Sequence, residues 1–265
     1  MKTIKEVTKK PKIYQVYIDE EMISVEPEVY FRYHLKAGLE LESSTYIALI
    51  QDNEYAYYFR IGIEKLKKMM TKKELSDYLL SKGAKIAMVH QLISLFEQRK
   101  YLDDYSYAKT YFSLKERTEG PDMIQNKLRE KGVSQAIISG FIANYREDEI
   151  LADLVGKKLK SIHNKSKKQA IQSTKSYFIS KGFSMDAIDR NIKNNLHLFQ
   201  TDELLLIQKE YQKLLKKYQE KMEAHELKYF LTQKLYQKGF SIEDIHKVLA
   251  WPYNSFRDKI MVGVF

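Results

Sequence analysis

The sequence has no cysteine, only four prolines, ten glycines and one tryptophan in 265 residues. Without cysteine there can be no disulfide, no thiolate zinc site and no cysteine nucleophile. The absence also agrees with a reducing compartment. None of the prolines interrupts a long periodic segment, and so few glycines argue against a nucleotide-binding βαβ unit.

Long apolar runs are missing as well. No stretch approaches the roughly 18 apolar residues of a membrane-spanning helix. The chain starts Met1-Lys2-Thr3-Ile4-Lys5, which does not resemble a secretory signal. We therefore expect a cytoplasmic protein that makes no membrane contact.

Residue patterns typical of catalytic, metal or cofactor sites are also lacking. None of the six histidines shares the i, i+4 spacing of a metal site. No nucleophile–base pair and no glycine-rich phosphate loop stands out. The sequence therefore predicts no catalytic residue, no metal and no cofactor, and thus a protein that is not an enzyme.

The charge is unbalanced in the basic direction. Lys and Arg number 45 against 35 Asp and Glu, which gives a formal net charge of +10. Such an excess favours a polyanionic partner, such as a nucleic acid or a nucleoprotein, although solubility alone is the plainer explanation.

The chain has two parts that differ in predicted secondary structure. Residues 3–25 contain β-formers around the polar turn Asp19-Glu20-Glu21, which predicts a hairpin, and the run before Pro11 adds a possible third strand. After about residue 43, apolar residues recur with helical spacing, as in Val89, Leu92, Ile93 and Phe96.

An internal repeat is the strongest signal. The pair Lys-Gly recurs with its glycines 49, 50 and 57 residues apart, at Lys82-Gly83, Lys131-Gly132, Lys181-Gly182 and Lys238-Gly239. Counted from each glycine, positions −8, −4, +6 and +10 are large and apolar in fifteen of sixteen cases, the exception being Thr174. This pattern predicts two helices joined at a left-handed glycine, with a further helix before each pair.

The repeat fixes the expected architecture. We predict a mainly α fold of tandem three-helix repeats forming an elongated curved array, with a small N-terminal module that contains a β-hairpin. A repeat of this size should have little core of its own and pack on its neighbours. The alternative is a single compact all-helical domain. The predicted segments are the N-terminal module with its linking helix (1–58), four repeats (59–101, 102–146, 147–200, 201–251) and a tail (252–265), with Trp251-Pro252 closing the last repeat.

The segment 101–132 carries a family resemblance. It begins with Leu102-Asp103-Asp104, followed by an aromatic residue and Ala108. Glycine, isoleucine and leucine then stand at fixed spacing before a Lys-Gly pair, as Gly120, Ile124, Leu128 and Lys131-Gly132. This set resembles the RecX family. Glu74-Leu75, Leu79 and Lys82-Gly83 are similar to its first repeat, and the β-rich start and fourth repeat resemble its longer Gram-positive form.

The resemblance implies a function. RecX proteins bind the recombinase RecA, lie along its filament on DNA and inhibit recombinase, ATPase and coprotease activity in DNA repair, recombination and the SOS response. We therefore expect RecA, as monomer and filament, to be the partner of a monomeric chain. The alternative is a sequence-specific DNA-binding protein of tandem three-helix units, but Gln91, Gln135, Arg190 and Asn191 share no repeat position.

Two groups of charged residues each have two interpretations. Asp103 and Asp104 begin a predicted helix, so capping explains them better than contact with a partner. The pre-glycine lysines, Lys82, Lys131, Lys181 and Lys238, either complement helix C-termini or form a repeated basic ridge. We assign a structural role to Leu102, to the two aspartates and to the four repeat glycines.

A basic run is the best candidate for contact with the phosphate backbone of DNA. Residues 154–185 contain no acid. Within this stretch stand Lys157, Lys158, Lys160, Lys165, Lys167 and Lys168. Such contact would carry no base-sequence information. The alternative is a solvated loop.

Overall fold

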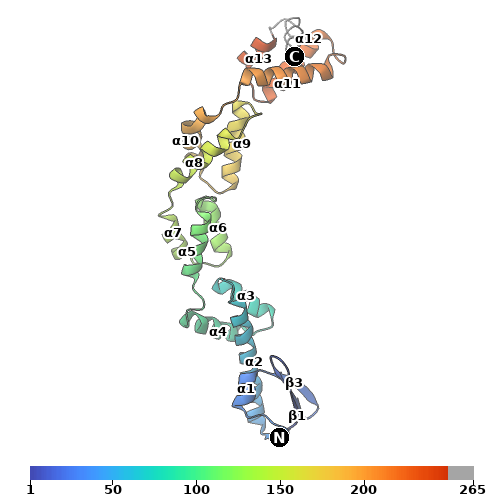
Figure 1. The fold of residues 1–265 in the computed structure, drawn as a ribbon, viewed down its shortest axis with the longest axis vertical. Helices are drawn as coiled ribbons and strands as arrows, with labels where there is room; N and C mark the ends of the chain where they lie inside the picture. Colours follow the sequence, from blue (N-terminus) through green and yellow to red (C-terminus); the bar gives the residue numbers. More distant parts are fainter. Residues whose placement is uncertain (250–265) are drawn as a thin grey trace, which may run out of the picture. The chain divides into compact units, whose positions relative to one another are not determined.

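The computed structural model describes residues 1–249, which contain thirteen α-helices and four β-strands (Figure 1). The predicted mainly α fold with a small N-terminal sheet is confirmed. Trp251-Pro252 and the tail 252–265 lie outside the described residues. The chain forms two compact units: Met1–Tyr111 with Lys127–Gly140, and Phe112–Asn126 with the chain from Phe141 onward.

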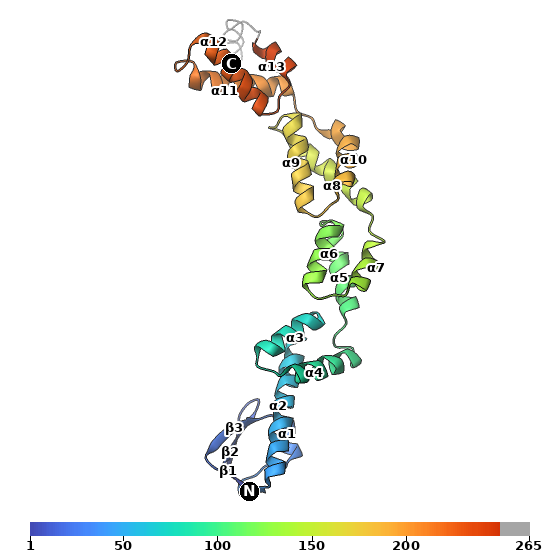
Figure 2. The same cartoon turned by 180° about the vertical axis from the view of Figure 1, so that it is seen from behind.

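The N-terminal sheet contains the predicted hairpin and third strand. Strands β1 (Lys2–Lys9), β2 (Tyr14–Ile18), β3 (Glu21–Val25) and β4 (Glu40–Leu41) are antiparallel in the order β3-β2-β1-β4. Asp19 adopts a positive φ of 51° in the tight β2–β3 turn. The two-residue strand β4 was not predicted, because its pairing with β1 is long-range. Figure 2 shows β1, β2 and β3 beside α1 and α2.

Two helices cover this sheet. Helix α1 (Pro27–Arg32) begins with proline at its first position, and α2 (Ser43–Lys65) extends for 23 residues. Their apolar faces share one cluster with the strands, with Ile4, Val16 and Leu49 at its centre and fully buried. Residue 58, where the N-terminal module was expected to end, lies inside α2, so a continuous helix leads into the first repeat.

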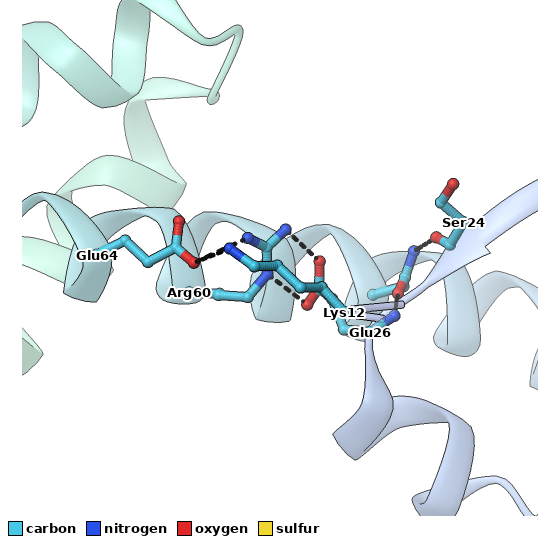
Figure 3. Close-up of polar contacts among 6 residues, drawn as sticks. Lys12, Ser24, Glu26, Arg60 and Glu64 are labelled. Carbon is cyan, nitrogen blue, oxygen red and sulfur yellow. Dashed lines mark hydrogen bonds and ion pairs between the residues drawn. The ribbon is translucent and has the colours of Figure 1, made fainter. Parts of the chain in front are cut away.

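Polar contacts fix the end of β3 to α2 (Figure 3). The Arg60 guanidinium binds both carboxylate oxygens of the nearly buried Glu26, at 2.7 and 2.9 Å. Lys12 reaches Glu64 one turn further along α2, at 3.4 Å. The bidentate Arg–Glu pair satisfies a carboxylate that would be costly to bury alone.

Helices in sets of three make up the remainder, as predicted. Their bounds are α3 (Lys72–Ser81) and α4 (Ile86–Gln98) after α2; α5 (Asp104–Lys115), α6 (Pro121–Glu130) and α7 (Gln135–Ile142); α8 (Glu147–Lys160), α9 (Lys167–Ser180) and α10 (Met185–Asn195); and α11 (Glu203–Tyr218), α12 (Ala224–Gln237) and α13 (Ile242–Leu249). A short 3₁₀ turn, η1 (Leu196–Leu198), follows α10.

Separate apolar clusters belong to individual repeats. Leu75, Leu79 and Phe96 centre the first repeat, and the third and fourth repeats have clusters around Val155 and Ile245. The expectation that a repeat has little core of its own is therefore wrong for these three. The residues at −8, −4 and +6 from each glycine are buried, Thr174 included.

Each repeat glycine ends a helix in the left-handed conformation, as predicted. Gly83, Gly132, Gly182 and Gly239 have φ of +93°, +80°, +83° and +81°. In each case the next residue donates its N–H to a carbonyl five residues back, as Val133 does to Leu128 at 3.0 Å. This is the Schellman closure, with an apolar residue immediately after glycine that is buried in all four repeats.

Candidate partner and nucleic-acid interface

The four pre-glycine lysines share a role that resides in their backbone. The Thr71 hydroxyl, at the N-cap of α3, donates to the carbonyl oxygen of Lys131 at 2.6 Å. The Ser166 hydroxyl, at the N-cap of α9, donates to that of Lys238 at 2.8 Å. The start of the second helix of one repeat thus binds the end of the second helix of the next.

The other two lysine carbonyls are bonded by different means. Lys181 accepts the backbone N–H of Gly120 at 2.8 Å, and Gly182 accepts that of Asp122 at 3.1 Å. Lys82, in the first repeat, accepts the hydroxyl of Tyr58 from α2 at 3.2 Å. A helix C-terminus leaves its last carbonyls without intrahelical partners. In every repeat, a preceding segment supplies one.

Close approach at these junctions leaves no room for a side chain at two glycines, and at one of them, Gly120, backbone conformation alone would not require glycine. A Cβ on Gly132 would lie 2.5 Å from Cβ of Lys73, and one on Gly120 would lie 2.2 Å from the carbonyl oxygen of Gly182. Gly120, which has no positive φ, is therefore needed for space. The repeat register identified Gly132 and the family resemblance included Gly120, but neither indicated the surface that each glycine contacts.

The two aspartates have separate structural roles. Asp103 caps its own helix, accepting the N–H of Tyr105 at 2.9 Å and the hydroxyl of Ser106 at 2.6 Å, which confirms the capping interpretation. The buried Asp104 instead accepts the N–H of Lys72 at 2.9 Å, at the start of α3. Burial raises the pKa of Asp104 despite this bond. At the start of α9, the Glu203 carboxylate likewise accepts the backbone N–H of Lys167, at 2.7 Å.

The side chains of the pre-glycine lysines have no common environment. Lys131 pairs with Glu74 and Lys238 with Glu210. Lys82 and Lys181 lie over the rings of Tyr78 and Tyr177, at 5.7 and 5.9 Å from the ring centroids. The one contact that the four residues share is therefore made by the backbone, and two of the four side-chain charges are already compensated.

The basic run spans a turn between two helices rather than one helix face. Lys157, Lys158 and Lys160 end α8, Lys165 lies in the connecting loop, and Lys167 and Lys168 begin α9. Lys157 pairs with Asp153 at 2.6 Å, just before the acid-free stretch, and Lys158 lies over Tyr177 at 4.5 Å. The exposed Lys160 and Lys165 have no carboxylate partner within residues 1–249.

Lys167 and Lys168 stand in an unfavourable place for a helix. They occupy the first turn of α9, where the helix dipole favours anions. The equivalent residues of α3 are Lys72 and Lys73, and these pair with Glu97 at 2.8 Å and Asp77 at 2.9 Å. In the part of the chain that the structure describes, neither α9 lysine has such a partner. Helix stability therefore does not explain them.

A cleft opens beside these two lysines. It has a volume of about 490 Å³, and its lining includes Lys167, Lys168, Lys175, Glu203, Ile171, Tyr236 and Phe240. Lys175 pairs with Asp189 at 2.6 Å. A second cleft, of about 570 Å³, lies in the N-terminal module beside the Glu26–Arg60 pair and contains none of the predicted site residues.

Residues 1–249 contain no cluster of histidine and acidic side chains able to hold a metal ion. Over the same range, no helix has the length and apolar character needed to cross a membrane.

The fold and these junctions define a class: a protein of tandem three-helix repeats with a basic surface and an N-terminal β-module. No family model matches the sequence. Regulatory protein RecX of Oceanobacillus iheyensis is 30% identical over 233 residues, covering 85% of this chain and 86% of that protein. Regulatory protein RecX of Bacillus licheniformis is 28% identical, covering 88% and 92%.

A solved structure agrees in fold. A crystal structure of regulatory protein RecX superposes with a TM-score of 0.54 at 21% identity, covering 71% of this chain and 98% of that one. On the sequence likeness, the chain belongs to the RecX family of regulatory proteins.

Proposed function

We propose that this chain binds the recombinase RecA and its filament on DNA and inhibits the recombinase, ATPase and coprotease activities of RecA during DNA repair. The observation that carries the proposal is likeness to a regulatory protein RecX over most of both chains. We expect the chain to act in the cytoplasm as a monomer, without a cofactor and without catalytic activity of its own.

Contact with DNA phosphates is the second part of the proposal. The exposed lysines of the α8–α9 segment that form no ion pair within residues 1–249 (Lys160, Lys165, Lys167 and Lys168) support it, since such cations suit a phosphate backbone. Lys157 and Lys158 belong to the same candidate surface. Lys82, Lys131, Lys181 and Lys238 remain weaker candidates, because Lys131 and Lys238 are already ion-paired and the four side chains share no common environment.

Sequence-specific DNA reading is less well supported. Three of the four side chains considered for base reading are occupied, and the exposed Gln91 is the exception. Arg190 donates to Asp148 at 2.8 Å, and Gln135 accepts from Arg129 at 2.9 Å. Asn191 donates to Asp148 at 2.9 Å and is buried. Direct readout requires such groups to be free and to project into a groove.

A titration tests the main proposal. The purified chain is added to RecA on single-stranded DNA, and ATP hydrolysis is followed. We expect suppression below one chain per RecA monomer. Unchanged hydrolysis beyond that ratio contradicts RecA regulation.

Salt dependence tests the phosphate contacts. Each removed phosphate contact lowers the slope of log affinity against log salt by about 0.7 for single strands. Changing Lys160, Lys165, Lys167 and Lys168 to glutamine should reduce the slope for DNA without RecA. The matched control is Lys73→Gln, which removes a lysine already paired with Asp77. Equal slopes for both variants contradict this surface.

A further inference from the structure

The cleft beside the start of α9 combines two features that a phosphate-binding surface alone does not need. One is a pair of lysines, Lys167 and Lys168, without carboxylate partners in the described chain. The other is an aromatic wall: Tyr236 of α12 lines the cleft and is 51% exposed. Ile171 and the buried Phe240 add apolar lining.

Tyr236 does not contribute to the apolar core of its repeat. Its hydroxyphenyl ring is half exposed, whereas its helix neighbour Leu235 is fully buried and supplies the packing. The position three residues before the repeat glycine is Leu80, Arg129 and Ile179 in the other repeats. The fourth repeat alone has an aromatic residue there, facing the start of α9.

A cation stands close to this ring. The Lys168 ammonium lies 5.7 Å from the Tyr236 centroid, at the limit of a cation–π contact. The α3 counterpart, Lys73, bonds Asp77 at 2.9 Å and so is held elsewhere. Residue 172, which stands where Asp77 stands relative to the helix start, is glutamine. The α9 cleft therefore has the two lysines without an acid at the position of Asp77. The carboxylate that does line it, Glu203, bonds the backbone N–H of Lys167 at 2.7 Å and forms no ion pair with either lysine in the described chain.

We infer that this cleft takes one nucleotide of single-stranded DNA, with the base against the Tyr236 ring and the flanking phosphates at Lys167 and Lys168. A flat π-surface beside cations is the usual platform for an unstacked base. The volume of about 490 Å³ falls in the range of small-molecule sites. An acidic peptide would match the lysines but leave the ring unused.

This inference rests on the proposed phosphate contact and adds a preference for single strands. Bases in duplex DNA are already stacked and cannot enter the cleft. Tyr236 therefore discriminates between the two forms of DNA, whereas the lysines serve both.

The test measures binding to DNA alone, by fluorescence anisotropy, with three labelled probes of equal length: oligothymidylate, an abasic strand and a duplex. Tyr236→Ala should weaken oligothymidylate binding about five-fold or more, which is the effect of losing one base–aromatic stack. Binding of the abasic strand and of the duplex should not change. Lys167→Gln with Lys168→Gln should weaken binding of all three probes.

Two variants guard against a folding artefact. Tyr236→Phe keeps the ring and should keep the affinity for oligothymidylate. Tyr229→Ala removes another tyrosine of α12, which is 71% exposed and does not line the cleft, and should change nothing.

The inference is overturned if Tyr236→Ala leaves oligothymidylate binding intact or weakens the abasic strand equally. It is also overturned if a polyglutamate peptide displaces the labelled oligothymidylate as effectively as unlabelled oligothymidylate does. The cleft would then select an acidic protein segment. None of these measurements contains RecA. A chain that passes them but fails to suppress RecA would keep the nucleotide site and lose the proposed regulation.

Discussion

The Thr71 hydroxyl donates to the carbonyl oxygen of Lys131 at 2.6 Å while accepting the N–H of Glu74 at 3.2 Å. One buried oxygen thus caps the start of α3 and satisfies the end of α6. Thr71 is completely buried, so neither bond can be replaced by water. A single side chain links local helix capping to packing between consecutive repeats.

Removing this hydroxyl should therefore cost more than an ordinary cap. Thr71→Val keeps the shape but leaves the Lys131 carbonyl without its donor. We expect the free energy of unfolding to fall by roughly 2–4 kcal/mol, since a lost N-cap costs about 1 kcal/mol and an unsatisfied buried group about 1–3. Denaturation followed by circular dichroism measures this.

Two variants calibrate that loss. Thr71→Ser retains the hydroxyl and should recover most of the stability. Thr232→Val removes an exposed hydroxyl that bonds within its own helix and should stay within about 0.5 kcal/mol of the wild type. If Thr71→Val were as mild as Thr232→Val, the junction would not contribute to stability.

The repeat glycines should differ in their tolerance of alanine. Gly83 and Gly132 both have positive φ, which costs an alanine about 1–2 kcal/mol. At Gly83 the nearest atom to a new Cβ is the Tyr58 hydroxyl, at 3.4 Å, whereas at Gly132 the Cβ of Lys73 lies at 2.5 Å. Gly132→Ala should therefore destabilise the protein clearly more than Gly83→Ala in the same denaturation assay. Equal losses would show that conformation alone matters and that the junction yields freely.

Much of this fold follows from local sequence rules. The spacing of apolar residues about each Lys-Gly pair identified buried positions, because helical periodicity and the left-handed glycine are local properties. Ser184 and Ser241 stand two residues after their glycines, where serine favours capping of the next helix. They accept the N–H of Ala187 at 3.4 Å and of Asp244 at 3.0 Å.

Contacts between residues far apart in the sequence could not be predicted from these local rules. Asp104 resembles a second cap for its own helix, yet it bonds Lys72, which is 32 residues earlier. The lysine before each glycine suggested a side-chain function, whereas the shared contact is made by its carbonyl, a group that every residue has. The basic run looked uncompensated because Asp153, the partner of Lys157, lies one residue before the acid-free stretch.

Thr174 is the one repeat position where the sequence departs from the apolar pattern, and the structure shows a cost. Its side chain is fully buried on α9, and its hydroxyl oxygen has no hydrogen-bond partner among residues 1–249. Thr174→Val replaces that hydroxyl by a methyl group of similar shape. We expect a gain of about 1 kcal/mol in the free energy of unfolding, because an unsatisfied buried polar group is removed.

The matched change at this position is Thr174→Ser, which keeps the hydroxyl and removes the methyl group. It should destabilise the protein, since it loses apolar burial and retains the unsatisfied oxygen. A loss of stability in Thr174→Val would mean that the hydroxyl is hydrogen-bonded in solution.

Glu210 should make the fourth repeat sensitive to acid. Its side chain is 17% exposed and bonds Lys213 at 2.8 Å and also Lys238. The hydrogen bond from Lys213, followed by that from Lys238, holds the pKa of Glu210 below its ordinary value of 4.5. A carboxyl with a lowered folded pKa stabilises the fold above its unfolded pKa. That contribution disappears as the pH falls through the folded pKa.

Glu210→Gln removes this dependence. At neutral pH the variant should be less stable than the wild type by up to about 1 kcal/mol, as is usual for partly exposed ion pairs. As the pH falls through the folded pKa of Glu210, the two stability curves should converge. The measurement is denaturation at a series of pH values, with Glu220→Gln as the control because Glu220 is exposed and has no ion-pair partner in the described chain. Curves for Glu210→Gln and wild type that stay parallel into acid would show that the carboxyl contributes no pH-dependent stability. The link between Lys238 and α11 would then be steric.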